Sequence, residues 1–290
     1  QERLSLLRPQ SLLDDPLNRL SEGFQVPPIF KKRVGFWFSI YTQFGSHEHV
    51  IHHSRFPWIV FEVVNTKRFL KGRGALWYRR QKGLDHVQER LRKIRSALQQ
   101  MSRRSNFRNL TTLQKNLYNK LKGIGGARRS VFKEAASNLR SQLGQRDFFR
   151  SGLRRSHQYL PTMEAIFNRK GLPTELTRIP FVESSFNIQA RSKVGASGIW
   201  QIMPRTGKSY LTVNSQIDER NSPLKATRVA ASILKRYRRA LGSWPLAITA
   251  YNHGIGNMRK AIRRVGSEDL AVIVTKYRGG HFQFASSNFY

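Results

Sequence analysis

Carboxylates are scarce in the second half of this sequence, and one of them stands apart. Seven acidic residues follow residue 150, namely Glu164, Glu175, Glu183, Asp218, Glu219, Glu268 and Asp269. Glu183 lies in the apolar stretch Ile-Pro-Phe-Val-Glu-Ser-Ser-Phe, whereas the other six have polar or charged neighbours. Apolar surroundings raise the pKa of a carboxyl group, which then stays protonated near neutral pH and can donate to a leaving oxygen. Glu183 is therefore the candidate general acid, although a partly buried structural glutamate fits the same pattern.

Two further blocks follow the Glu183-Ser184 pair. Residues 198–204 read Gly-Ile-Trp-Gln-Ile-Met-Pro, and residues 250–254 read Ala-Tyr-Asn-His-Gly. The three blocks resemble, in order and spacing, the signatures of the soluble lytic transglycosylase family and its goose-type lysozyme relatives, which are a Glu-Ser pair, a Gly-Leu-Met-Gln-like block ending in Pro, and Ala-Tyr-Asn-Ala-Gly. Within that family the chain is most similar to the membrane-bound lytic murein transglycosylase D branch. The resemblance extends over residues 149–290.

The resemblance implies a role for each matching residue. Glu183 corresponds to the single catalytic acid/base, and the expected substrate-binding residues are Ser184, Ser192, Trp200, Gln201, Met203, Tyr251 and Asn252. Among these, Tyr251 and Asn252 match positions that hold the glutamate and the acetamido group of the sugar. Two positions depart from the common pattern. Trp200 stands where many members have Met and is expected to offer a stacking face, and His253 replaces a small Ala and adds a titratable ring near the cleft.

A single carboxyl group limits the chemistry that Glu183 can perform. Most glycosidases use two carboxyl groups, but an acetamido oxygen of the substrate can replace the second one. The resemblance implies cleavage of the β-1,4 bond between N-acetylmuramic acid and N-acetylglucosamine in peptidoglycan, with the sugar's own C6 hydroxyl closing a 1,6-anhydro ring and no cofactor taking part. Two alternatives stay open. One is a lysozyme-type hydrolase on the same fold, and the other is a non-catalytic cationic protein that binds cell wall or nucleic acid.

The elements that must position these residues are short helices. Apolar spacing and breakers predict helices from Pro161 to Gly171, from Thr174 to Glu183, from Pro223 to Leu241, from Pro245 to Asn252 and from Asn257 to Val265. The predicted fold class is therefore mainly α, and the resemblance implies a lysozyme-like all-α catalytic domain over residues 149–290.

The first half has a different pattern. Residues 1–30 contain four prolines and no sustained period, which indicates a leader or linker. Residues 31–148 are predicted to form a smaller α+β accessory domain with an antiparallel sheet. The expected strands are an alternating run at 34–40, the histidine-rich run 49–53, the apolar run 58–64 and a hairpin at 69–77, and the expected helices cover 84–98, 111–122 and 129–143.

Four histidines in the first half raise the question of a metal site. His47 and His49 share one face of the expected strand, whereas His52 and His53 do not converge with them, so no three-ligand set follows and no metal is predicted. The aromatic residues between 36 and 61 are assigned mainly to the core.

Charge is the strongest feature of the composition. The chain has 52 Lys and Arg against 17 Asp and Glu, a formal net charge of +35, and this charge is spread over both halves. Anionic wall or envelope polymers are the expected neighbours beside peptidoglycan glycan strands, and nucleic acid is disfavoured because the charge is not focused. No apolar run reaches the roughly 20 residues of a transmembrane helix. With no cysteine and Gln1 as first residue, the sequence fits a periplasmic or secreted protein whose signal peptide has been removed.

Overall fold

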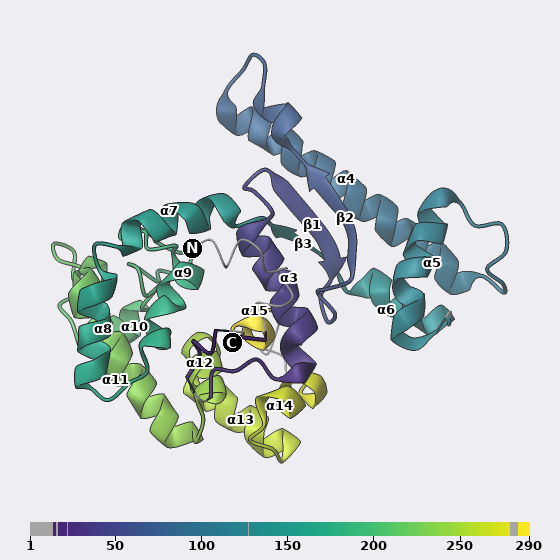
Figure 1. Ribbon diagram of the computed structural model, residues 1–290. Helices are drawn as coiled ribbons and strands as arrows, with labels where there is room; N and C mark the ends of the chain where they lie inside the picture. The colour runs from purple at the N-terminus through teal and green to yellow at the C-terminus, as the bar shows by residue number, and fades with distance from the viewer. Residues whose placement is uncertain (1–13, 16, 22, 127, 279–283) are drawn as a thin grey trace. The chain divides into compact units, whose positions relative to one another are not determined.

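The computed structural model describes residues 14–278 and 284–290, except positions 16, 22 and 127. The chain divides into two compact units (Figure 1). One unit is Lys31–Asp147, and the other joins Gln1–Phe30 to Phe148–Tyr290. Helices make up most of the described chain, which confirms the predicted mainly α fold with a small antiparallel sheet.

The Lys31–Asp147 unit contains the sheet. Its strands β1 (Glu48–His53), β2 (Val60–Asn65) and β3 (Leu139–Leu143) are antiparallel in the order β2-β1-β3. Its helical elements are α3 (Lys31–Thr42), the 3-10 turn η2 (Lys67–Leu70), α4 (Leu76–Arg103), α5 (Thr112–Gly125) and α6 (Arg129–Ser137). The apolar stripe of α4, including Val87, Leu91, Ile94 and Leu98, packs into one core with Phe132 of α6 and Phe61 of β2. The expected strands at 49–53 and 58–64 and the helices at 84–98 and 111–122 are confirmed.

Three expectations for this unit are wrong. The strand expected at 34–40 is the helix α3, because Phe36 and Ile40 are four residues apart and bury the same helical face. No hairpin forms at 69–77. Gly72 and Gly74 have φ values of 99° and 100° in an irregular loop, and α4 already begins at Leu76. The helix expected over 129–143 ends at Ser137, because residues 139–143 pair with the free edge of β1.

The second unit is built from short helices around α11. These elements are η1 (Pro28–Phe30), α7 (Arg146–Ser156), α8 (Leu160–Arg169), η3 (Thr174–Arg178), α9 (Ile179–Glu183), α10 (Pro204–Lys208), η4 (Glu219–Asn221), α11 (Pro223–Leu241), α12 (Trp244–His253), α13 (Ile255–Val265), α14 (Leu270–Lys276) and α15 (Phe284–Asn288). The core side of α11 presents small and aliphatic residues such as Ala230 and Leu234 to Phe167 of α8 and to Trp200. The helices expected from the proline and glycine signals are confirmed.

Described residues before α3 pack against the rest of the second unit. The backbone N–H of Ser21 donates to the Glu175 carboxylate at 2.9 Å. The Phe24 ring lies 6.3 Å from the Trp244 ring, and the Tyr290 hydroxyl donates to the Gly23 carbonyl at 3.2 Å. Among the residues that the structure describes, no helix is both long enough and apolar enough to cross a membrane.

Candidate active site

Glu183 is the last residue of α9, and the backbone turns sharply after it. This five-residue helix begins at Ile179, has Pro180 in its first turn, and buries Ile179 and Phe181. Ser185 and Phe186 then adopt left-handed conformations with φ of 51° and 57°. Such backbone strain in residues other than glycine persists only where the surroundings enforce it, and it is concentrated at functional sites.

Three contacts enforce this turn. The Phe186 ring is fully buried and packs edge-on against Phe181, with ring centroids 4.6 Å apart. From α7, the Arg155 guanidinium donates to the Ser185 carbonyl at 2.6 Å, and Gly152 lies so close to that carbonyl that an added Cβ would be 3.0 Å from its oxygen. The helix α7 therefore holds the chain in the conformation that ends α9 at Glu183.

The Glu183 carboxyl is set in an apolar environment with partial access to solvent. Burial raises its pKa to about 8, and no cation offsets this effect despite the strongly basic chain. At pH 7 such a group is protonated in roughly nine of ten molecules. Among the described residues, its carboxyl makes no hydrogen bond or ion pair, whereas other carboxylates of the unit are engaged, for example Glu164 with Arg178 and Asp218 with Arg220. The arrangement suits a general acid that works without a carboxylate partner.

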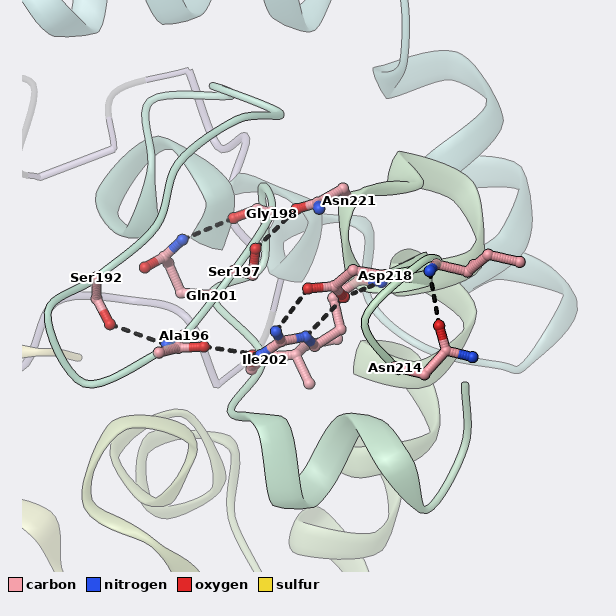
Figure 2. A network of polar contacts seen from close by, with 12 residues as sticks. Ser192, Ala196, Ser197, Gly198, Gln201, Ile202, Asn214, Asp218 and Asn221 are labelled. Carbon is pink, nitrogen blue, oxygen red and sulfur yellow. Dashed lines mark hydrogen bonds and ion pairs between the residues drawn. The ribbon is translucent and has the colours of Figure 1, made fainter. Parts of the chain in front are cut away.

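Ser184 joins the end of α9 to the second sequence block. Its hydroxyl donates to the Ile199 carbonyl at 3.0 Å and approaches the Pro180 carbonyl at 3.3 Å. The loop from Ser192 to Ile202 is shaped by similar local bonds (Figure 2). Ser192 accepts the Ala196 N–H at 2.9 Å, and the Gln201 amide donates to the Gly198 carbonyl at 2.9 Å. These side chains therefore hold the loop together, and Gln201 itself has a left-handed φ of 47°.

A buried arginine, Arg220, binds backbone carbonyls of this loop. The Arg220 side chain is 2% exposed and forms an ion pair with the Asp218 carboxylate, with its Nη2 2.6 Å from Oδ2. Its other terminal nitrogen, Nη1, donates to the carbonyls of Gly195 and Ile202 at 2.8 and 2.9 Å. Gly198 has a φ of 74°, and a Cβ there would collide with the Arg220 carbonyl oxygen. The loop thus requires glycine at 198 and a paired cation at 220.

The third block reaches the same place from α12. The Tyr251 hydroxyl donates to the Trp200 carbonyl at 2.9 Å. Burial raises the pKa of Tyr251 well above its usual value, and the charge of Glu183 raises it further, so the two groups lie within electrostatic reach. Glu183, Ser184, the 198–204 block and Tyr251 are therefore brought together by contacts.

Three other residues of these sequence blocks, Met203, Asn252 and His253, take no part in the contacts described so far. Met203 is 44% exposed. Asn252 is exposed, and its Oδ1 accepts the Ser286 hydroxyl at 3.3 Å. His253, expected near the cleft, is buried with its Nδ1 3.1 Å from the Ser286 oxygen of α15.

Trp200 contradicts the expectation that it stacks on a sugar. The side chain is 0% exposed, and its indole N–H donates to the Thr227 hydroxyl at 2.8 Å. Its ring lies nearly parallel to Phe167, with centroids 5.8 Å apart and an interplanar angle of 8°. The prediction is wrong because protein groups already surround the indole: Phe167 of α8 stacks on it, Thr227 of α11 accepts its N–H, and the Tyr251 ring lies edge-on with its centroid 6.3 Å away.

Sequence reasoning did not single out the Arg220 and Asp218 pair or Thr227. The only available signal was an Asp and an Arg two residues apart just before Pro223. That pattern is common at exposed positions, so it did not predict a buried ion pair. The described residues contain no group of three or more histidine, cysteine or acidic side chains that could hold a metal ion.

Comparison with known proteins locates the resemblance. Residues 163–274 match the family described as the Transglycosylase SLT domain, and this range contains all three blocks. The chain is 35% identical over 111 residues to two proteins named membrane-bound lytic murein transglycosylase D, from Escherichia coli strains K12 and O6:H1. The matched segment covers 38% of this chain and 25% of each relative.

Solved structures also match, among them an inactive mutant of the lytic transglycosylase Slt from Pseudomonas aeruginosa. Its identity to this chain is 18% and the TM-score is 0.37, with coverage of 99% of this chain and 46% of that one.

Proposed function

Because residues 163–274 carry a transglycosylase SLT domain, we propose that this domain cleaves the β-1,4 bond between N-acetylmuramic acid and N-acetylglucosamine in peptidoglycan, with Glu183 as its acid/base. One observation gives this proposal its main support. Glu183 is a carboxyl group with a pKa of about 8 at the place where the three sequence blocks meet. A protonated carboxyl in that setting can donate to the glycosidic oxygen at neutral pH.

The first step breaks the glycosidic bond. The Glu183 proton passes to the leaving O4 of N-acetylglucosamine while the bond from O4 to C1 of N-acetylmuramic acid breaks. The acetamido oxygen of the same sugar forms a bond to C1 and takes the place of a carboxylate nucleophile. A single carboxyl suffices for this step, which agrees with the engagement of Asp218 and Glu164 in ion pairs elsewhere.

The second step closes the anhydro ring. The ionised Glu183 takes the proton of the C6 hydroxyl, O6 forms a bond to C1, and the bond from C1 to the acetamido oxygen breaks. No water is consumed, and Glu183 returns to its protonated form. A carboxyl whose pKa lies near the working pH can perform both proton transfers, since neither of its two forms is strongly disfavoured.

The neighbours of Glu183 act by position. The Tyr251 hydroxyl donates its hydrogen to the Trp200 carbonyl. The hydroxyl oxygen of Tyr251 can therefore accept a hydrogen bond from the protonated Glu183 carboxyl and orient it. Met203, with 44% of its surface exposed, and the exposed Asn252 are available to contact sugar. Ser184, Ser192 and Gln201 contribute by fixing the loop, and Gln201 keeps its amide oxygen as an acceptor for substrate.

The same proposal includes the setting of the enzyme. Peptidoglycan lies outside the cytoplasmic membrane, so the site of action is periplasmic or extracellular. The net charge of +35 favours contact with the carboxylates and phosphates of the envelope, which are the anionic partners proposed beside the glycan strands.

Mass spectrometry of digested peptidoglycan tests the proposal. The wild type should release fragments with 1,6-anhydro ends, and Glu183→Gln should release none above background. Fragments heavier by one water would assign a lysozyme-type hydrolase instead. If the wild type releases no fragments, or if Glu183→Gln releases them as fast as the wild type, Glu183 is not the acid/base. A folded Glu183→Gln variant, checked by circular dichroism, is needed for that comparison.

A further inference from the structure

The Lys31–Asp147 unit has one segment in which exposed apolar side chains lie among cations. This segment, the Lys67–Leu84 tip, comprises η2, the loop 71–75 and the first turns of α4. Seven of its residues are basic and none is acidic: Lys67, Arg68, Lys71, Arg73, Arg79, Arg80 and Lys82. Its exposed large hydrophobic residues are Leu70, Leu76, Trp77, Tyr78 and Leu84, of which Trp77 is 73% exposed.

The exposure follows from the way α4 is packed. Its core contacts begin at Gly83, where an added Cβ would be 3.2 Å from the Thr66 Cβ, and continue through Val87. At 100° per residue, Leu76 and Leu84 fall on the same apolar stripe as Val87, and Trp77 lies beside them. The first turns of α4 and the loop before them extend beyond β1 and β2 of this unit (Figure 1). Leu76 and Leu84 therefore carry apolar surface past the core, and 46% and 45% of these side chains stay exposed.

The tip is ordered by its own contacts. The Arg79 guanidinium donates to the carbonyls of Leu70 and Gly72 at 2.6 and 2.9 Å and so fastens the loop to the helix. The Lys82 ammonium lies 4.7 Å from the centre of the Tyr78 ring. Trp77 is consequently presented by a short, fixed platform, which lowers the entropy that a partner must overcome on binding.

Tryptophan, tyrosine and leucine surrounded by lysine and arginine are the residues that proteins place at the boundary between water and lipid. We propose that the Lys67–Leu84 tip binds the surface of a lipid bilayer that contains anionic headgroups. Leu76, Trp77 and Leu84 enter the boundary of the acyl chains, while the surrounding cations contact headgroup phosphates. This interaction is separate from the proposed glycosidase site and does not depend on it.

Two other occupants fit the tip less well. A second copy of the chain would bring the same seven cations and the same net charge of +35 to the contact, and the two tips would repel each other. A sugar platform is disfavoured because the Trp77 and Tyr78 rings are inclined by 73°. Within the tip, Gln81 is the only carboxylate or carboxamide side chain that could bind hydroxyl groups.

Vesicle binding by the full chain tests the proposal, because a basic protein also binds anionic surfaces without insertion. Partition onto vesicles of phosphatidylcholine with phosphatidylglycerol is compared with partition onto phosphatidylcholine alone. Trp77→Ser should weaken binding to the anionic vesicles at least tenfold. Val194→Ser, which removes an apolar side chain that is also 73% exposed but lies in the other unit, should leave it unchanged. The pair Arg73→Gln and Arg80→Gln should weaken binding roughly fivefold per cation, since each is worth about 1 kcal/mol near an anionic surface.

Matched measurements distinguish insertion from charge alone. Arg259→Gln with Arg263→Gln makes the same charge change on the exposed side of α13 and should have a clearly smaller effect. Vesicles should shift the wild-type tryptophan emission to shorter wavelength, and Trp77→Phe should retain binding and lose that shift. The proposal is overturned if Trp77→Ser binds vesicles like the wild type or if both arginine pairs have equal effects. It is also overturned if Trp77→Ser weakens binding to purified glycan strands and leaves vesicle binding intact.

Discussion

Replacing Glu183 by glutamine should stabilise the protein, and the gain should grow with pH. Burial raises the native pKa of Glu183 from 4.5 to about 8. Between these two values the folded protein keeps a proton that the unfolded chain has released. Each increase in pH through this window therefore favours unfolding. Glutamine keeps the shape of the protonated side chain and removes the titration, so the variant is free of this pH-dependent cost.

The size of the effect follows from the two pKa values. At about 1.36 kcal/mol per pKa unit, the wild type loses about 1 kcal/mol at pH 5, about 3 kcal/mol at pH 7 and about 5 kcal/mol at pH 9, relative to strongly acidic solution. For a unit of about 170 residues, 1 kcal/mol corresponds to about 3 °C in Tm. Glu183→Gln should therefore melt about 3 °C above the wild type at pH 5 and about 9 °C above it at pH 7.

Differential scanning calorimetry of the wild type and Glu183→Gln from pH 5 to pH 9 measures this difference directly. Glu219→Gln is a control of opposite sign. Lys225 and the Thr212 N–H lower the pKa of Glu219, so its contribution to stability is present above pH 4.5 and its removal should lower Tm there. If the difference in Tm between Glu183→Gln and the wild type is the same at pH 5 and pH 9, then the Glu183 pKa is not raised and the argument for a neutral general acid fails.

Two further substitutions test the framework around Glu183. Gly198→Ala should cost more than about 3 kcal/mol in urea unfolding, because the φ of 74° and the Arg220 carbonyl both exclude a Cβ; Gly123→Ala, in α5 with no atom near the added Cβ, should cost nothing or stabilise. Tyr251→Phe should lower stability by about 1–3 kcal/mol, because the Trp200 carbonyl loses its donor. Release of peptidoglycan fragments by Tyr251→Phe should fall more than its folded fraction does, and an undiminished rate per folded molecule would show that the hydroxyl does not orient Glu183.

The helices around the site were predictable because proline and glycine residues mark their ends in the local sequence. The helix α11 begins at Pro223, whose fixed φ suits a first turn, and it ends at Leu241, just before Gly242, which takes the left-handed φ of 77°. The sheet was predictable only in part. The strand β3 exists because residues 139–143 meet β1, which lies about ninety positions earlier in the chain, and no local pattern reports such a partner. The apolar residues at 34–40 fit both the two-residue period of a strand and the helical spacing of four. The structure is helical because Phe36 and Ile40 are buried together on one helical face.

Trp200 shows that a sequence block can locate a site correctly while the orientation of a side chain within it is not predicted. The block meets the end of α9 through the bond from Ser184 to the Ile199 carbonyl. The Trp200 indole, however, bonds to Thr227 of α11, and its backbone carbonyl accepts the Tyr251 hydroxyl. The orientation depends on the φ of 47° at Gln201 and on carbonyls held by Arg220, and both are tertiary features. The backbone carbonyls of Ile199 and Trp200 therefore bind Ser184 and Tyr251, so the block meets both neighbours mainly by backbone geometry. Substitutions at Trp200 should act through core volume and the lost indole N–H, as expected for a buried residue that substrate does not touch.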